Sequence, residues 1–576
     1  MLMTGRGYKK SRPLASSLDG YALRLIAATD RFLRAELSFG RALACFAGFL
    51  VVALIVALSA GGTYLSTNFL DYLFMVEQGW RLAQGQLPYR DFISPLGPLY
   101  YLIVGSVEYL SGADPAAYRL NGFLAMTLFG PGLVWISWRR LPGKVAVFVA
   151  IAFAMIPLTP RNIDGMFFDF DFLAIYNSLC WPLAATVILG SLLESKPGNC
   201  RRLTLADGLA IGLALIGLLT LKLPHGVIAS GVLAIGLIIR PANRLCLAAA
   251  ALLTFAAIAL LYLSAAPLPH LYLQQLIAVG HANDLSARVH SKLQIYVYSQ
   301  MVTLLLALFA IWMIEKYRQF HPVRIGYRDV AAAGAILLAS YGEAINDHGD
   351  TPAALPLLFL LLWQVALRAN LPIEGKSGSR YRQIKACLLA VPFLLWLGLP
   401  LANDSLALIF HSISFRLRPS TAWLAALPDQ KHLVRHLRLP GNLSAAGSNV
   451  QDDADLTDQW GVYLQALEEG VKELQTLKLD HAKIYEARFN SALPWLLQAP
   501  SPRGVLAWLD MDRTFSLASH PPADSYLSDV DVLMVSKLAY DRPWTRYFSA
   551  IYGVVIERDF IRVSDTTYWQ IYKRRS

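Results

Sequence analysis

Long apolar segments recur through the first 400 residues, and they constrain the fold more than any other feature of the sequence. An α-helix needs about 20 apolar residues to cross a bilayer. The chain is 55% hydrophobic with a mean hydropathy of +0.43, which is typical of membrane proteins. We therefore expect a mostly α, polytopic membrane protein with about 11 transmembrane helices. The predicted spans are 42–62, 117–136, 145–159, 172–193, 204–221, 223–239, 245–265, 295–314, 329–346, 352–368 and 384–402.

Segment 96–112 decides the topology, because it is long enough for a thin span but two prolines open it. If it lies flat, the basic loops between the later spans fall on the same side as the basic N-terminus, as the positive-inside rule requires. If it spans, those loops move to the opposite side. We expect the flat arrangement, with the protein in the cell (inner) membrane, the N-terminus in the cytoplasm and the C-terminal region outside the cytoplasm.

The sequence divides into three regions, 1–41, 42–403 and 404–576. The first is predicted to be a cytosolic amphipathic segment that rests on anionic lipid, rather than a cleavable signal. The last is more polar and is predicted to be a soluble α/β domain. Its predicted helix is 460–478, and its predicted strands are 483–487, 505–509, 530–535, 552–556 and 567–572.

The first outer loop, residues 67–101, follows the first span and gathers polar and aromatic side chains. Breaks that combine Gly and Pro lie at 85–88 and 94–98, which predicts two short juxtamembrane helices joined by a turn. The charged residues of this loop are Asp71, Glu77, Arg81, Arg90 and Asp91.

Three features of this loop together resemble the first outer loop of GT-C glycosyltransferases of the protein-mannosyltransferase or aminoarabinose-transferase type. They are Asp71 after the first span, the Pro-Tyr-Arg-Asp-Phe sequence at 88–92, and the Gly-Pro-Leu sequence at 97–99. The resemblance is good over 65–175, weaker to about 400 and absent beyond. It implies an enzyme that takes a sugar from a polyprenyl-phosphate carrier. The Lys-Pro-Pro-Leu motif that such enzymes often carry is absent, and residues 94–99 stand near its place.

Asp71 is the first candidate for the catalytic base. A carboxylate at the bilayer edge is partly desolvated, which raises its pKa and suits it to accept a proton. The alternative is that Asp71 caps the short helix that follows it. Asp91 is the second catalytic candidate, and Tyr89 is a candidate for substrate binding.

The second outer loop, residues 159–172, brings Arg161, Asp164, Asp169 and Asp171 close to aromatic residues. The acidic residues are either a solvated rim or part of a substrate site. The family resemblance implies a match at Asp169 or Asp171, and Arg161 is a reserve candidate for binding the donor phosphate.

Two further breaks carry candidate binding residues. Lys222 and His225 lie three residues apart between two spans, where a basic residue either extends to lipid headgroups or binds a phosphate. Asp347 and His348 lie in the last outer loop and are candidates for substrate binding. The three carboxylates and the histidine of this loop, at 343–350, suit a metal cluster, an acid–base site or an ordinary short loop. With no further support for a metal, we expect no metal and no cofactor.

Three functions compete. A glycosyltransferase with an inverting mechanism needs a polyprenyl-phosphate sugar donor and a glycan, lipid or protein acceptor, and no nucleotide motif. A transporter or flippase of lipid-linked glycan would carry ionisable residues at mid-membrane, whereas here they gather at one face. The third possibility is a structural scaffold with an outer recognition domain, and no feature of the sequence supports it. The basic residues lie in short membrane loops, so the expected partners include membrane lipids but not nucleic acid.

Overall fold

The structure is a computed structural model of the chain. It describes residues 35–64, 69–111, 114, 117–161, 166–170, 175–196, 201–265, 267–282, 285–316, 326–346, 354–368, 376–417, 437–438 and 459–575.

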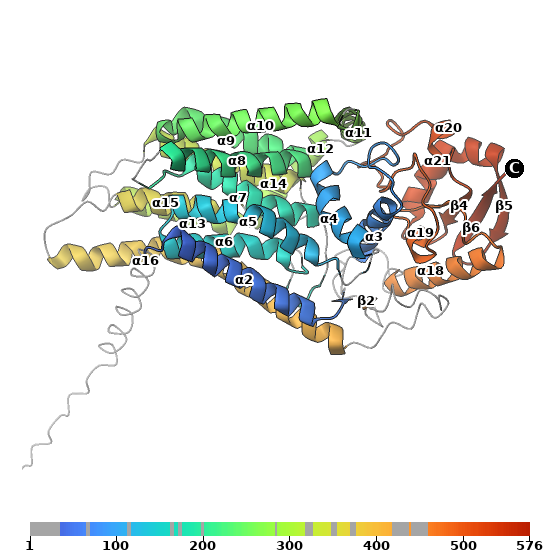
Figure 1. The fold of residues 1–576 in the computed structure, drawn as a ribbon, viewed down its shortest axis with the longest axis horizontal. Helices are drawn as coiled ribbons and strands as arrows, with labels where there is room; N and C mark the ends of the chain where they lie inside the picture. Colours follow the sequence, from blue (N-terminus) through green and yellow to red (C-terminus); the bar gives the residue numbers. More distant parts are fainter. Residues whose placement is uncertain are drawn as a thin grey trace, which may run out of the picture.

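Helices dominate the first three quarters of the chain, as Figure 1 shows. In chain order the elements are α2 (Phe39–Ser59), β1 (Thr63–Tyr64), α3 (Phe69–Ala83), α4 (Pro98–Ser111), α5 (Leu120–Arg140), α6 (Gly143–Leu158), α7 (Ile175–Leu192), α8 (Arg201–Leu221), α9 (Leu223–Ile239), η1 (Pro241–Asn243), α10 (Arg244–Ser264), α11 (Leu268–Ala282), α12 (Leu285–Ser299), α13 (Met301–Lys316), α14 (Tyr327–Asn346), α15 (Pro356–Arg368) and α16 (Lys376–Leu417).

Five of the described helical segments are long and apolar enough to cross a membrane, or six if the bent pair α12–α13 counts as one. The five are α2, α5, α7, residues 204–221 of α8, and η1 with α10. The chain is therefore a polytopic helical membrane protein, as predicted. Helix α4 has 14 residues, and the helices at three predicted spans, α6, α9 and α15, are also short, with 16, 17 and 13 residues. The flat arrangement of 96–112 therefore stays a prediction.

Small residues let the membrane helices approach closely. Gly208 and Gly212 lie four residues apart on α8 and face α10. A Cβ atom at these positions would lie 2.9 Å from the carbonyl oxygen of Cys246 and 3.2 Å from that of Ala250. Packing of this kind holds helices together where no hydrophobic effect drives them.

Two predicted spans differ from the structure. The predicted span 295–314 is two helices, because the chain bends by 56° at the break between α12 and α13. The predicted span 384–402 is part of α16, which continues to Leu417 and passes the expected boundary at 404. The apolar pattern ends near 402, but the helix does not.

The C-terminal region forms a small domain with a four-stranded mixed sheet in the order β3-β4-β6-β5. Strand β3 is parallel to β4, and the other neighbouring pairs are antiparallel. The elements are α18 (Gln459–Thr476), β3 (Ile484–Ala487), α19 (Leu493–Leu496), α20 (Ala523–Tyr526), β4 (Val532–Ser536), α21 (Arg542–Asp559), β5 (Phe560–Asp565) and β6 (Trp569–Arg574); β2 (Leu437–Arg438) pairs with β1 instead.

Two of the predicted strands are wrong. Residues 552–556 belong to α21, where Tyr552, Val555 and Ile556 are buried on one helical face. Residues 505–509 do not form a strand of the sheet and make only an isolated bridge between Leu506 and Ile93. Strand β5 was not predicted. The predicted helix and the other three strands are confirmed to within a few residues.

Candidate functional site

Helix α3 and the turn after it form the first part of the site. Gly85 ends the helix in the left-handed conformation, at φ +76°. The N–H of Gly85 donates to the carbonyl of Leu82, and that of Gln86 to the carbonyl of Arg81. These two bonds form a Schellman motif, which satisfies the last carbonyls of the helix and reverses the chain. The predicted helix and turn are therefore confirmed.

Asp91 closes the next turn. Its Oδ2 accepts hydrogen bonds of 2.8 Å from the N–H of Leu87 and from Nη2 of Arg90. Burial raises the pKa of Asp91, but the hydrogen bonds from Arg90 and Leu87 and the charges of Arg90 and Arg503 bring it below its usual value. This environment holds Asp91 as a carboxylate and suits a structural role better than proton abstraction.

Tyr89 fixes the loop from inside. It is buried, and its backbone has a φ of +68°. Its hydroxyl donates to the carbonyl of Leu96. Gln275 of α11 bridges the two ends of the loop, because its Nε2 donates to the Tyr89 carbonyl at 2.8 Å and its Oε1 accepts from the Ser94 N–H at 3.0 Å. Helix α11 therefore holds the loop in one conformation.

The end of this loop lies against the break between α8 and α9. The N–H of Gly97 donates to the carbonyl of Leu221 at 3.1 Å. A Cβ atom at Gly97 would lie 2.2 Å from the Thr220 carbonyl oxygen, so only glycine allows this approach. The next residue, Lys222, consequently lies beside the loop segment 94–99.

Lys222 is held by two residues of α7. Its Nζ donates to Oδ1 of Asn177 at 2.6 Å and lies 5.2 Å from the centroid of the Tyr176 ring. The Tyr176 ring in turn contacts Tyr100 of α4 edge-on. The loop, the helix break and α7 thus meet at one end of the bundle.

Lys222 is also the N-cap residue of α9, and its own side chain makes no capping hydrogen bond. The positive end of a helix dipole attracts anions. His225 lies in the first turn of α9, is buried, and lines a cavity between α7, α9 and α14 together with Glu343. Glu343 accepts a hydrogen bond from the N–H of Ala354.

A segment of the C-terminal domain lies against the first outer loop. We call residues 499–507 the docking strip. Four side chains at the end of α3 and in the turn bind its backbone. Trp80 and Gln84 donate hydrogen bonds to the Ala499 carbonyl, and Gln84 also accepts one from the N–H of Ser501. Gln86 donates to the Ser501 carbonyl, and Arg81 donates to the Pro502 carbonyl.

Main-chain bonds extend this contact. The N–H of Ile93 donates to the Val505 carbonyl at 2.9 Å, and the Ala507 N–H donates to the Ile93 carbonyl at 3.1 Å. The N–H of Gly504 donates to the carbonyl of Asp91 at 2.7 Å. The first outer loop is therefore fixed by the C-terminal domain as well as by α11.

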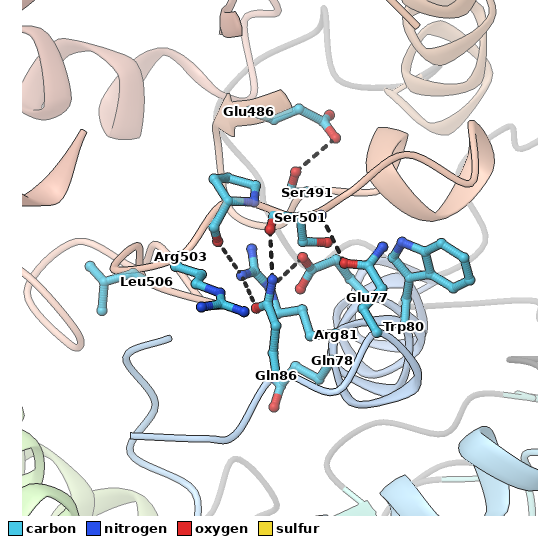
Figure 2. A network of polar contacts seen from close by, with 12 residues as sticks. Glu77, Gln78, Trp80, Arg81, Gln86, Glu486, Ser491, Ser501, Arg503 and Leu506 are labelled. Atoms are coloured by element: carbon cyan, nitrogen blue, oxygen red, sulfur yellow. Dashed lines mark hydrogen bonds and ion pairs between the residues drawn. The ribbon is translucent and has the colours of Figure 1, made fainter. Parts of the chain in front are cut away.

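Arg81 is the centre of this contact, as Figure 2 shows. Its side chain is fully buried, and its Nε lies 2.6 Å from Oε1 of Glu77. Its Nη1 donates to Gln86 at 3.2 Å and to the Pro502 carbonyl at 2.7 Å. Burial raises the pKa of Glu77, although the Arg81 charge opposes this shift. Sequence analysis missed this network, because the residues it joins lie more than 400 positions apart.

The remaining predicted site residues are dispersed. Arg161 forms a buried ion pair with Asp404 of α16 at 2.6 Å. Asp169 accepts a hydrogen bond from the N–H of Met166 in its own turn. Asp71 lies in the first turn of α3, but its side chain is outside the described part of the structure. Asp164, Asp171, Asp347 and His348 lie outside the described residues.

Among the residues that the structure describes, no group of three or more His, Cys, Asp or Glu side chains is placed to hold a metal ion.

No protein-family model matches the sequence, and no curated protein matches it. Two solved structures are similar, ArnT from Cupriavidus metallidurans in the apo state and the same protein bound to undecaprenyl phosphate. Each has a TM-score of 0.44 and 14% sequence identity over 91% of this chain, and 96% and 97% of those chains are covered.

Proposed function

We propose that this protein is a membrane glycosyltransferase of the GT-C type, which moves a sugar from a polyprenyl-phosphate carrier to an extracytoplasmic acceptor by an inverting mechanism. The observation that carries the proposal is the position of Lys222. The Gly97–Leu221 hydrogen bond seats this lysine beside the loop segment that lacks the expected lysine.

In this proposal Lys222 and the N-terminus of α9 bind the donor phosphate. The polyprenyl tail lies in lipid, so the phosphate must lie at the membrane surface, where α8 and α9 meet. A lysine held at that depth stabilises the negative charge that grows on the phosphate as the bond to the sugar breaks. Asn177 and Tyr176 fix the ammonium group in place, and both are uncharged.

Asp71 is the proposed base. It takes the proton from an acceptor hydroxyl while the hydroxyl oxygen forms a bond to the anomeric carbon and the polyprenyl phosphate leaves. One displacement of this kind inverts the anomeric configuration. Asp91 is assigned a supporting role, because Arg90 and Leu87 hold it ionised within the turn.

The other predicted site residues have supporting roles in this proposal. His225 lies behind Lys222 in the first turn of α9 and supports the phosphate site. Asp169, Asp171, Asp347 and His348 remain proposed acceptor contacts at the outer surface, and Tyr89 shapes the loop that faces the substrate. Arg161 stays a reserve donor contact whose charge is already shared with Asp404.

The test is product analysis of the purified full-length protein in lipid nanodiscs with a panel of polyprenyl-phosphate sugars. The proposal predicts release of polyprenyl phosphate and a glycoside of inverted anomeric configuration. Asp71→Asn should lower turnover by on the order of a hundredfold or more, because the amide caps a helix but takes no proton.

Asp524→Asn is the matched control, because this carboxylate is 77% exposed on the C-terminal domain and pairs with Arg558, which is itself largely exposed. Turnover by the Asp71→Asn variant at the parent rate would reduce Asp71 to a helix cap. Movement of intact lipid-linked glycan across the membrane without bond cleavage would instead favour a flippase.

A further inference from the structure

Three buried polar side chains with no hydrogen-bond partner among the described residues lie on α3 and α4, where these two helices pack together. Glu108 of α4 is completely buried, and neither of its carboxyl oxygens has a hydrogen-bond partner among the described residues. The hydroxyls of Tyr72 and Tyr100 are buried and unpartnered in the same sense. Such groups are uncommon in folded proteins, and each calls for a physical explanation.

Glycine at position 79 makes this burial possible. A Cβ atom at Gly79 would lie 2.5 Å from Cγ of Glu108 and 2.6 Å from its Cβ. Gly79 therefore forms a notch in α3 that receives the Glu108 side chain. Helix α3 also contains Asp71 near its start and Arg81 near its end. Glu108 therefore packs against the helix that presents the proposed base.

Within the described part of the chain, no positive charge compensates this carboxyl group. The charged group that acts on it is the carboxylate of Asp114, while Tyr72 of α3 and Tyr100 of α4 are the titratable groups that feel its charge. Arg119 acts on Tyr72 instead. Burial first, and Asp114 second, raise the pKa of Glu108 well above its usual value. An ionised carboxylate in this place would cost far more free energy than a neutral acid.

We propose that Glu108 is a proton-carrying carboxylic acid that seats α3 on α4 and is thereby a positioning residue for Asp71; this inference rests on the proposed function. The neutral acid adds no net charge to an environment whose nearest titratable groups are two tyrosine hydroxyls and the carboxyl of Asp114. Loss of the proton forces the side chain out of the Gly79 notch and shifts α3, so transfer requires Glu108 to be protonated.

Infrared spectroscopy of the full-length protein tests the protonation state without any substrate. The parent should show the carbonyl stretch of a protonated carboxylic acid at neutral pH, with the small shift that deuterium exchange gives. Glu108→Gln should lose the part of this band that Glu108 contributes, and Glu468→Gln, at a partly exposed position on α18, should keep the whole band. A Glu108→Gln spectrum that retains the full band of the parent overturns the proposal.

Stability gives a second measurement that does not depend on activity. A carboxyl whose pKa is raised by folding stabilises the protein at low pH, and this stabilisation is lost as pH rises from the ordinary value near 4.5. Thermal stability should therefore fall less steeply with rising pH in Glu108→Gln than in the parent. Identical slopes in the two proteins would also contradict the proposal.

Activity then tests the positioning role. Glu108→Gln should preserve transfer and remove part of its decline at alkaline pH, while Glu108→Leu should lower kcat at least tenfold with little change in the donor KM. A loss of transfer in Glu108→Gln equal to that in Glu108→Leu would reject positioning by the neutral acid. If the parent transfers no sugar from any donor, the proposed function fails, and the infrared and stability measurements still decide the state of Glu108.

Discussion

The N–H of Gly97 donates a hydrogen bond to the carbonyl of Leu221, and this contact joins two segments that the sequence keeps more than 120 residues apart. A Cβ atom at position 97 would lie 2.2 Å from the carbonyl oxygen of Thr220, so Gly97→Ala must separate the loop from the helix break. We expect this variant to bind polyprenyl phosphate at least tenfold more weakly, as measured by titration in nanodiscs. Gly231→Ala is the control, because no described atom outside the adjoining turns of α9 lies within 4 Å of the place that its methyl group would take.

Lys222→Ala should weaken the interaction with the donor phosphate. A direct charge-assisted contact is worth about 2–3 kcal/mol, which corresponds to roughly a 30- to 150-fold loss of affinity. Lys222→Arg should retain part of the affinity because it keeps the charge. Lys472→Ala, at an exposed position on α18, controls for general effects of charge. Unchanged donor affinity and turnover in Lys222→Ala would show that this lysine only extends to lipid headgroups.

Arg81→Met should destabilise the contact between the first outer loop and the C-terminal domain. The change leaves Glu77 buried without its partner, which typically costs about 3–5 kcal/mol. Thermal unfolding and the rate of proteolysis within the C-terminal domain measure the effect. Arg558→Met, at a largely exposed ion pair, should change neither. Restoration of stability by Glu77→Gln in the Arg81→Met background would identify the unpaired charge as the cause.

The C-terminal domain should lose stability as pH rises from about 4.5 to about 7. Burial raises the pKa of Glu486 from 4.5 to about 7, although Arg488 opposes the shift. The folded domain therefore binds a proton in this range that the unfolded chain releases, and the stabilisation disappears as that proton is lost. Unfolding monitored by tryptophan fluorescence should show the decline in the parent and a flatter profile in Glu486→Gln.

The topology prediction needs a separate measurement. A cysteine introduced at Ala518, an exposed position of the C-terminal domain, should react with a membrane-impermeant thiol reagent in intact cells after the native cysteines are replaced. A cysteine at Glu36, before α2, should react only after the cells are opened. The reverse pattern would place the docking strip and the first outer loop in the cytoplasm.

Hydropathy predicted most of the membrane region, because each helix buries or exposes an apolar surface along its whole length. Hydropathy failed where a bend or a helix extension is not visible in the average hydropathy of a segment. The break beside Gln300 divides an apolar segment into two bent helices, and α16 continues past its last apolar turn to Leu417. In the C-terminal domain, the β-branched run at 552–556 suggested a strand. Tertiary packing of Tyr552, Val555 and Ile556 on one side makes it a helix.

The site was predictable only where its parts are close in sequence. The turn at Gly85, the short helix α4 and the break at Lys222 all have local signals in glycine and proline. No local sequence signal predicts that Lys222 pairs with Asn177 or that Arg81 pairs with Pro502, because each contact depends on how distant segments pack. Glu108 also gave no signal, since a single acidic residue in an amphipathic helix looks like a solvated one.

The docking strip contributes only main-chain atoms to its hydrogen bonds with the first outer loop. The register of this contact therefore depends on the spacing of carbonyl and amide groups along the strip. Side chains of the strip add constraints of their own, because the charge of Arg503 acts on Asp91, Gly504 has a φ of +77°, and Val505 and Leu506 are buried. Removing one residue would displace every later donor and acceptor by one place, so the length of the strip is the property that selection must preserve.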